Sequence, residues 1–208
     1  MSRRTIAIAA ALSVLALGSP LITANANPLA TQYFNQGVEK YKAGNYRGAI
    51  AAWSKAIEIN PRDADAYYNR GIAKRKLNDY QGAIADYTKA IEINPQLAIA
   101  YLNRGNAKSG SSDYQGAIND YTKAIEIDPQ YTLAYYNRGV AKSLSGDPQG
   151  AIKDWGKTIE IDPQYAPAYM NRGIKREVQN DLEGACQDWR KAAELGRKEP
   201  AKWVKQQC

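Results

Sequence analysis

The chain has 208 residues, of which 44% are hydrophobic and 24% are charged, and it contains no histidine. This composition is typical of a soluble folded protein and excludes a disordered chain. The missing histidine excludes Ser-His-Asp catalysis, Cys-His catalysis and histidine-based metal sites, so carboxylates, Lys, Tyr and two cysteines remain for chemistry. A formal charge of +7 favours an anionic partner only if the basic residues form one surface.

Residues 1–26 have the features of an export signal. Arg3 and Arg4 precede an apolar run from Thr5 to Leu17, and the sequence ending at Ala26 has the small-x-small pattern of a cleavage site. The run is shorter than the roughly 20 residues that cross a bilayer, and it fits the ~7–15 residues of a signal peptide. The sequence therefore predicts a cleaved signal peptide ending at Ala26, with an uncleaved anchor as the alternative.

This signal determines where the chain is expected to act. An exported chain would reside in the periplasm, an organelle lumen or the extracellular medium, with no membrane span after cleavage. General secretion is the default route, and Arg3-Arg4 also resembles part of a twin-arginine signal.

The basic excess lies at the C-terminus. Residues 190–208 hold six Lys or Arg and two Asp or Glu. No basic stripe runs through the rest of the chain, as a nucleic-acid groove would require, so we expect no nucleic-acid partner. We interpret the cluster as a solvated surface, and an acidic partner or an anionic surface is the alternative.

A period of 34 residues organises the chain after the signal. Five units follow one another without insertion inside a predicted array over residues 27–199: 30–63, 64–97, 98–131, 132–165 and 166–199. Within each unit, position 8 is Gly, position 20 is Ala and position 24 is Trp or Tyr, while position 32 is Pro in the first four units. Such a period indicates stacked supersecondary units that bury their apolar faces against one another.

This pattern resembles the tetratricopeptide repeat family, and the resemblance covers nearly the whole chain after the signal. Thr158 in place of Ala at position 27 and Arg197 in place of Pro at position 32 are the departures. The resemblance implies an all-α, right-handed superhelical solenoid of five 34-residue helix-turn-helix repeats. Each repeat would pair an antiparallel helix A and helix B, and the helices A would line a concave groove.

The residues support the same hairpins independently. Gly at position 8 and Ala at position 20 allow two helices to approach closely. Asn or Asp at position 16 is a natural N-cap for helix B, and the Asn-Pro and Asp-Pro pairs at positions 31 and 32 end that helix. Residues 200–208 then predict a capping helix that begins at Pro200 and carries Trp203 at position 4 of a truncated sixth unit.

Arg at position 7 and Asp at position 23 occur together in the second to fifth units. The first unit lacks both and has Gln36 and Ala52. Pairing between units would leave Arg70 opposite Ala52, whereas pairing within a unit leaves no residue without a partner. We therefore predict four structural ion pairs, each joining helix A to helix B of one repeat. They are Arg70–Asp86, Arg104–Asp120, Arg138–Asp154 and Arg172–Asp188.

Asn occupies position 6 in all five units, although it is a mediocre helix former. Its amide can donate to and accept from a peptide backbone, and in the tetratricopeptide repeat family position 6 faces the groove. The resemblance thus implies a peptide-binding ladder; the alternative is that each amide bonds a neighbouring turn or helix. Tyr68 and Tyr136, at position 5, are expected to contribute contacts. The ladder comprises Asn35, Asn69, Asn103, Asn137 and Asn171.

One specific activity of the family is not expected. Its carboxylate clamp for chaperone C-termini needs Lys at position 5 and Asn at position 9 of one unit. Phe34 and Val38 stand at those positions in the first unit, and Leu133 stands where a later unit needs Lys.

The two cysteines lie near each other in the predicted fold. Cys186 replaces an Ile at position 21 and is expected to be buried, and Cys208 ends the capping helix. Export permits a disulfide, so the two residues either pair or remain free thiols.

The sequence as a whole predicts a non-catalytic scaffold or assembly factor that binds an extended segment of a protein partner, without a metal or another cofactor. We expect no enzyme, because caps, pairs and solvated faces account for the acidic residues. The alternative is a structural protein that oligomerises through its ends or its convex face and leaves the groove empty.

Overall fold

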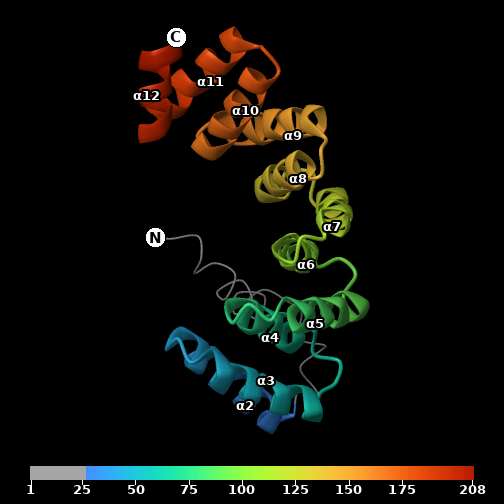
Figure 1. The fold of residues 1–208 in the computed structure, drawn as a ribbon. Coiled ribbons are helices and arrows are strands. Elements are labelled where there is room, and N and C mark those ends of the chain that lie inside the picture. The colour runs from blue at the N-terminus through green and yellow to red at the C-terminus, as the bar shows by residue number, and fades with distance from the viewer. Residues whose placement is uncertain (1–26) are drawn as a thin grey trace. The chain divides into compact units, whose positions relative to one another are not determined.

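The computed structural model describes residues 27–208, so the predicted signal peptide over residues 1–26 lies outside the described residues. The described chain forms two compact units, residues 27–96 and residues 97–208. From here on these are called the first and the second unit, and the five 34-residue segments are called repeats. All regular structure in this part of the chain is helical (Figure 1). The first unit contains α2 (Pro28–Lys42), α3 (Tyr46–Ile59), α4 (Ala64–Lys76) and α5 (Tyr80–Ile93). The second contains α6 (Ala98–Gly110), α7 (Tyr114–Ile127), α8 (Thr132–Leu144), α9 (Pro148–Ile161), α10 (Ala166–Val178), α11 (Leu182–Glu194) and α12 (Lys198–Gln207).

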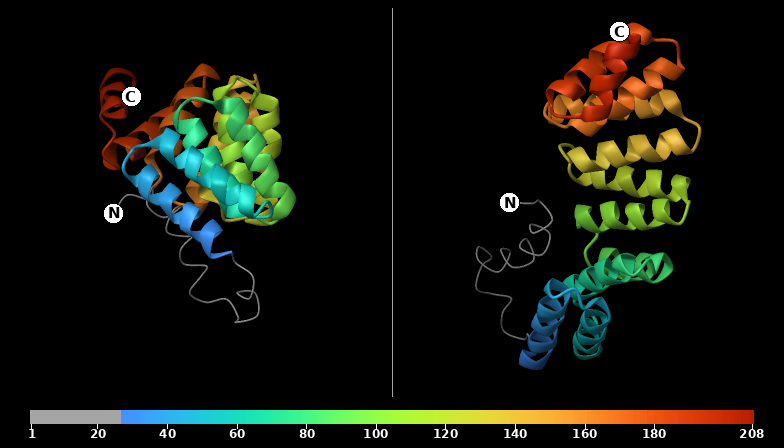
Figure 2. Two further views of the ribbon diagram at one scale, coloured as in Figure 1. Left: turned by 90° about the horizontal axis from the view of Figure 1, so that it is seen from below. Right: turned by 60° about the vertical axis from the view of Figure 1, so that its left-hand side comes forward.

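Consecutive helices pack as hairpins within each unit. In the first unit α2 packs against α3 and α4 against α5, with α3 and α4 joining the two hairpins. In the second unit α6 packs against α7, α8 against α9 and α10 against α11, and each helix B also contacts the helix that follows it (Figure 2). The prediction of paired antiparallel helices in 34-residue repeats is confirmed. Even-numbered helices α2 to α10 are the helices A, and odd-numbered helices α3 to α11 are the helices B.

One residue in each hairpin turn has a left-handed backbone. Position 15 has φ between 62° and 88° in all five repeats. The backbone N–H of position 16 then donates to the carbonyl oxygen of position 11, as in a Schellman motif, which gives the last carbonyls of helix A a partner. Gly occupies position 15 in two repeats and Asn in two. The residues are Gly44, Asn78, Ser112, Gly146 and Asn180.

Ser112 is the exception at this position, because Ser has neither the freedom of Gly nor the left-handed tolerance of Asn. We expect Ser112→Gly to raise the free energy of unfolding by about 1 kcal/mol. The measurement is urea unfolding followed by circular dichroism. The reverse change at the matching turn, Gly146→Ser, should lower stability by a similar amount. A change of the same sign in both variants would contradict the explanation.

The N-caps of the helices B are confirmed. The side chain at position 16 accepts a hydrogen bond from the backbone N–H of position 19, at 2.8–2.9 Å in all five repeats. Position 19 is always Gly, and a β-carbon there would collide with the capping side chain. The sequence pattern therefore contains a second Gly column, whose function is to leave room for the cap.

The core of each hairpin is built on Gly at position 8 and the aromatic ring at position 24. A β-carbon on Gly139 would lie 2.7 Å from Trp155 Nε1, and the other four repeats have the same close approach. The missing side chain thus admits a ring of the same repeat. Trp155 Nε1 also donates to the backbone oxygen of Tyr136 at 3.3 Å. Thr158, the departure at position 27, is fully buried, and its hydroxyl donates to the Asp154 carbonyl oxygen at 2.9 Å.

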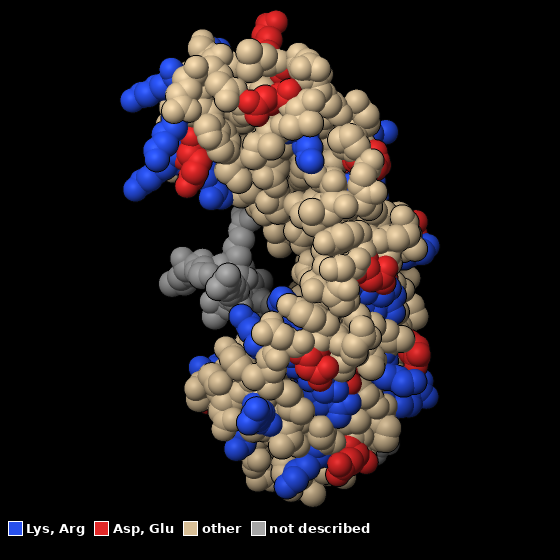
Figure 3. Space-filling view, in the orientation of Figure 1, with Lys and Arg blue, Asp and Glu red and all other residues tan. Residues whose placement is uncertain are grey.

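The capping helix α12 packs on α11. It begins at Lys198, two residues before the predicted start at Pro200, so Pro200 lies within its first turn, where the missing N–H costs no helical hydrogen bond. Trp203 packs against Trp189 with ring centroids 5.4 Å apart. Lys198, Lys202 and Lys205 belong to the exposed surface of this helix. Lys and Arg side chains project from the end of the second unit where α12 lies (Figure 3).

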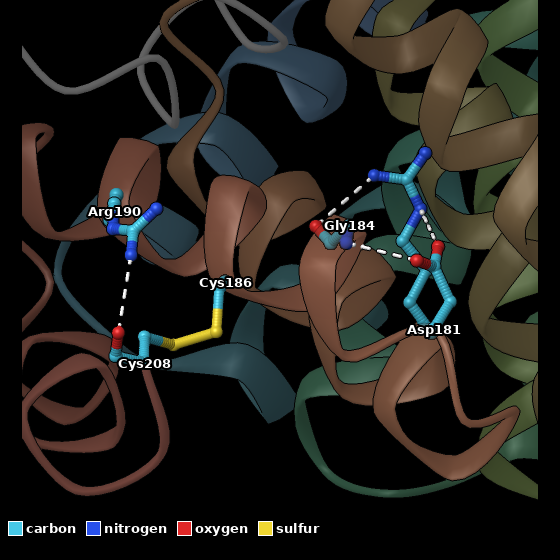
Figure 4. Close-up of a disulfide and its surroundings, with 6 residues drawn as sticks. Asp181, Gly184, Cys186, Arg190 and Cys208 are labelled. Carbon is cyan, nitrogen blue, oxygen red and sulfur yellow. Dashed lines mark hydrogen bonds and ion pairs between the residues drawn. A yellow bond between two sulfur atoms is a disulfide. The ribbon is translucent and has the colours of Figure 1, made fainter.

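Cys186 and Cys208 form a disulfide, with Cα atoms 5.8 Å apart (Figure 4). Cys186 is buried in α11, and Cys208 is the exposed last residue of the chain. Arg190 lies beside them, with Nη2 3.5 Å from the Cys208 carbonyl oxygen. The bond therefore fastens the end of α12 to the preceding helix B.

Candidate binding surface

The buried charges of the two units form four clusters of one design. In the second to fifth repeats Arg at position 7 donates through Nε and Nη2 to both oxygens of Asp at position 23, at 2.6–2.9 Å. The Asp side chains are 3–4% exposed. All four pairs join the helix A and the helix B of one repeat. The structure therefore brings together the residues that the sequence paired, in the bidentate geometry that suits Arg and carboxylate.

Each cluster contains a second cation that sequence reasoning missed. Lys or Arg at position 11 places its terminal nitrogen 2.8–2.9 Å from the Asp oxygen. The four additional pairs are Lys74–Asp86, Lys108–Asp120, Lys142–Asp154 and Arg176–Asp188. Position 11 lies one helical turn after Arg at position 7, and this i, i+4 spacing was a signal present in the sequence.

The Arg side chain also stacks on a ring and reaches the neighbouring repeat. Its guanidinium lies over the Tyr ring at position 4, with centroid distances of 5.4–5.8 Å in the four repeats. Arg138 Nη1 donates to the Thr122 hydroxyl at 3.1 Å, and Arg70 Nη1 donates to the Ser54 hydroxyl at 2.9 Å. These hydroxyls occupy position 25 of the preceding helix B. One Arg thus connects three helices.

Position 25 of the fourth repeat is Gly156, which offers Arg172 no hydroxyl. A β-carbon built on Gly156 would lie 3.5 Å from Arg172 Nη1, which is ordinary contact. We expect Gly156→Ala to raise the free energy of unfolding by about 0.5–1 kcal/mol, because Gly weakens a helix interior. Gly156→Ser should equal or exceed this gain, since a hydrogen bond to a charged group offsets the lower helix propensity of Ser. Thermal unfolding of the three proteins measures both effects, and a loss of stability in Gly156→Ala would contradict the prediction.

The Asn column at position 6 has two kinds of environment. Asn69, which is buried, donates through Nδ2 to the Asp65 carbonyl oxygen at 2.8 Å, and Asn103 donates to the Ile99 carbonyl oxygen at 3.0 Å. Both bonds reach the preceding turn of the residue's own helix. They fit the local alternative, as do the bonds of Asn137 and Asn171 to a neighbouring helix. Asn35 is exposed on α2.

The last two Asn residues connect successive helices A of the second unit. Asn137 Nδ2 donates to Asn106 Oδ1 at 2.9 Å, and Asn171 Nδ2 donates to the Tyr136 hydroxyl oxygen at 3.1 Å. Asn106 Oδ1 also accepts a hydrogen bond from the Tyr121 hydroxyl at 2.9 Å. Asn106 stands at position 9, where the other repeats have Val or Ile, so no repeated pattern indicated its role.

The two Tyr residues predicted at position 5 differ. Tyr68 is 3% exposed, and its ring lies 5.9 Å from that of Tyr87, so it is part of the core of the first unit. Tyr136 is partly exposed and packs on Tyr165 with centroids 5.0 Å apart. Burial raises the pKa of the Tyr136 hydroxyl above its ordinary value, while the hydrogen bond from Asn171 and the charge of Arg197 act in the opposite sense. Tyr136 therefore keeps its proton at neutral pH and can donate a hydrogen bond.

Two small pockets open between the helices A of the second unit. The first pocket, with a volume of about 140 Å³, is lined by Asn106, Ser109, Tyr121, Asn137 and Val140. The second has the same volume and is lined by Val140, Ser143, Leu144, Trp155, Asn171, Ile174 and Lys175. Adding the repeat length of 34 to the numbers of the five residues that line the first pocket gives five residues that line the second. The two pockets are therefore successive copies of one site. Each is smaller than the roughly 300–1,000 Å³ of small-molecule sites and has room for one side chain.

Within residues 27–208, no cluster of three or more His, Cys, Asp or Glu side chains could hold a metal ion. No helix in this same range is long and apolar enough to span a membrane.

Comparison with known proteins gives the family. The model for the tetratricopeptide repeat matches residues 64–97, and a second model, described as a TPR repeat, matches residues 37–76 and 111–146. The chain is a tetratricopeptide repeat protein. No curated protein matches the chain.

Solved structures agree with this tetratricopeptide fold. A structure of MamA is 28% identical, with a TM-score of 0.75 over 80% of this chain and 96% of that one. MamA from Desulfovibrio magneticus RS-1 is 22% identical, with a TM-score of 0.77 over 81% of this chain and 96% of that one. YrrB, described as a TPR protein with an unusual peptide-binding site, is 22% identical, with a TM-score of 0.72 over 85% and 92%. Tetratricopeptide repeat proteins are protein–protein interaction scaffolds, and this chain is one of them.

Proposed function

We propose that this tetratricopeptide repeat protein is an exported, non-catalytic scaffold that binds an extended segment of a partner protein on the helix A face of its second unit. That face comprises Asn106, Asn137, Asn171 and Tyr136 together with the two pockets. Asn137 and Asn171 each use one N–H inside the protein, and their Oδ1 atoms have no partner among the described residues. A fixed amide with a free carbonyl oxygen and a second N–H can pair with a peptide backbone.

The recurrence of one pocket at successive repeats is the observation that carries this proposal. A surface that repeats along a stack suits a ligand that is itself extended and repeats, such as a polypeptide backbone. The charged clusters do not compete for this role, because their Asp oxygens already accept bonds from two cations.

Export is part of the proposal, and its support is the disulfide. A bond between Cys186 and Cys208 persists in an oxidising compartment and is rare in the cytosol. Mass spectrometry of the chain from its native host tests export: an N-terminus at Asn27 is expected, and a chain that still begins near Met1 would show that the signal is not cleaved there.

The binding face is tested by a pull-down from the native compartment with three proteins. Asn137→Ala/Asn171→Ala is expected to recover much less partner than the unchanged chain. Asn119→Ala, an exposed Asn on helix B α7, is the matched control and should recover as much as the unchanged chain. Circular dichroism verifies that all three are folded. Equal recovery by all three would favour the alternative, in which the protein assembles through its ends or its convex face.

A further inference from the structure

We propose that the two pockets select two different side chains of the bound segment, and this inference rests on the proposed function. The first pocket would take an amide side chain, Asn or Gln. The second would take an aliphatic side chain that is followed or preceded by Asp or Glu. The partner segment is therefore a short extended motif with these residues in a fixed order.

The first pocket presents two polar groups that have no hydrogen-bond partner among the described residues. Asn106 Oδ1 accepts from both Tyr121 and Asn137, so the Asn106 amide is held with its Nδ2 group unpaired among the described residues. Asn137 Oδ1 is likewise unpaired there, because Asn137 uses Nδ2 for this bond. A donor and an acceptor side by side match the carbonyl and the N–H of an amide side chain. An aliphatic group would leave both unpaired, which costs free energy in a partly buried site.

The second pocket keeps Ser143 and Asn171 but is apolar where the first has Asn106 and Tyr121. Val140 replaces Asn106 and Trp155 replaces Tyr121. The aliphatic side chains of Ile174 and Leu144 also line the pocket. Leu144 is 55% exposed, which is high for an aliphatic residue beside a pocket. An aliphatic side chain would cover this surface and remove it from water.

Lys175 gives the second pocket its charge preference. The other helix A cations next to the pockets, at position 11, are each bound to a buried Asp, but Lys175 stands at position 10 and forms no ion pair with the described residues. Its side chain is partly buried in the pocket lining. Position 10 is Ala73, Ala107 and Ala141 in the preceding three repeats, so this cation belongs to one pocket only. An adjacent carboxylate on the ligand would complement it.

The spacing of the motif follows from the repeat. Helices α6, α8 and α10 are neighbours, joined by the Asn106–Asn137 and Tyr136–Asn171 hydrogen bonds. Packed helices lie about 8–10 Å apart, and three residues of a polyproline II chain span about 9 Å. The amide and the aliphatic residue should therefore be three positions apart. The acidic residue should lie next to the aliphatic one, on the side away from the amide.

The test uses the chain and two sets of four fluorescent peptides on an alanine background. The parent peptide carries Gln, then Leu three residues later, then Glu; three relatives replace Gln by Leu, Leu by Ala or Glu by Lys. A second set has the reversed sequence, because the pockets fix the order of side chains and not the direction of the chain. Fluorescence anisotropy gives the dissociation constants. We expect the parent of one set to bind best, with about a tenfold loss on replacing Glu by Lys.

Variants of the protein assign each preference to its pocket. Asn106→Val introduces the residue of the next repeat and should remove the preference for Gln over Leu at the first position. Lys175→Ala introduces the residue of the preceding repeats and should remove the preference for Glu over Lys. Lys153→Ala, an exposed Lys on helix B α9, is the control and should change neither. The buried Tyr87 hydroxyl already lacks a hydrogen-bond acceptor in this protein, so Asn106→Val is expected to fold, and circular dichroism verifies it.

Two results would distinguish a wrong pocket assignment from a wrong proposed function, on which this inference rests. If Asn137→Ala/Asn171→Ala weakens all peptides equally while the pocket variants leave the preferences unchanged, the face binds peptides and the pocket assignment is wrong. If no peptide binds to the folded, unchanged chain while Asn137→Ala/Asn171→Ala still lowers partner recovery, the motif is wrong and the proposed function stands; if that variant also recovers as much partner as the unchanged chain, both proposals are wrong.

Discussion

Replacing Asp154 with Ala should lower the free energy of unfolding by about 3 kcal/mol. Asp154 is 3% exposed and holds two cations, Arg138 at 2.7 Å and Lys142 at 2.9 Å. Removing it leaves both without a counter-charge in a partly buried site. We expect the lower end of the range for buried pairs, because the two cation side chains are 16% and 20% exposed and can reach water. Urea unfolding of the two proteins measures the change.

The first repeat supplies a matched control for this experiment. It has Gln36 and Ala52 where the fourth has Arg138 and Asp154, and it keeps a cation, Lys40, at position 11. The double variant Arg138→Gln/Asp154→Ala reproduces that arrangement and should recover most of the stability that Asp154→Ala loses. If the double variant is less stable than the single one, the loss does not come from stranded charge, and the account of the cluster is wrong.

The second cation also changes what a charge swap should do. Exchanging Arg104 and Asp120 would be expected to restore a simple pair. In the structure Lys108 lies 2.8 Å from an Asp120 oxygen, so the swap would place a new Arg beside Lys108. We therefore expect the swapped protein to remain less stable than the unchanged one.

Reducing the disulfide should lower the stability of the C-terminal end of the second unit by about 3 kcal/mol. Cys186 and Cys208 are 22 residues apart in sequence, and their bond removes the freedom of that loop from the unfolded chain. Trp203 of α12 also packs against Trp189 of α11. Hydrogen exchange of the α12 amides with and without a reductant measures the effect. We expect faster exchange in α12 after reduction and little change in the first unit.

The variant Cys208→Ser gives this measurement its control. It should exchange as the reduced chain does, and a reductant should have no further effect on it. If α12 exchanges at the same rate in the oxidised chain and in Cys208→Ser, packing alone holds the cap and the disulfide has no structural role.

The elements that could be predicted from the sequence are those whose residues recur in every repeat and interact within one hairpin. Asn or Asp at position 16, Gly at position 8 and the Asn-Pro and Asp-Pro pairs each act within one hairpin, so their spacing along the chain was enough to place them. The Arg–Asp pairs required a comparison between repeats, because Gln36 and Ala52 replace both partners together. Lys at position 11 escaped that comparison, since the first repeat has Lys40 there although it has no Asp to bind.

The candidate site was less accessible to sequence reasoning, because it depends on contacts between repeats. The Asn column is uniform in sequence, yet Asn137 donates to the Asn106 amide of the preceding helix A, whereas Asn171 donates to the Tyr136 hydroxyl. Asn106 is the only Asn at position 9 of the five repeats, so no repeated pattern in the sequence predicts the bond that Asn137 makes. The pockets likewise differ through single residues such as Lys175. A periodic pattern predicts the scaffold, and departures from the period provide the specificity.

Hydrogen exchange of the chain with and without its captured partner tests the central claim most directly. If an extended segment binds the helix A face, exchange should slow in α6, α8 and α10 of the second unit and remain unchanged in α7 and α9. Slower exchange confined to α7, α9 or α12, with α8 and α10 unaffected, would contradict the account.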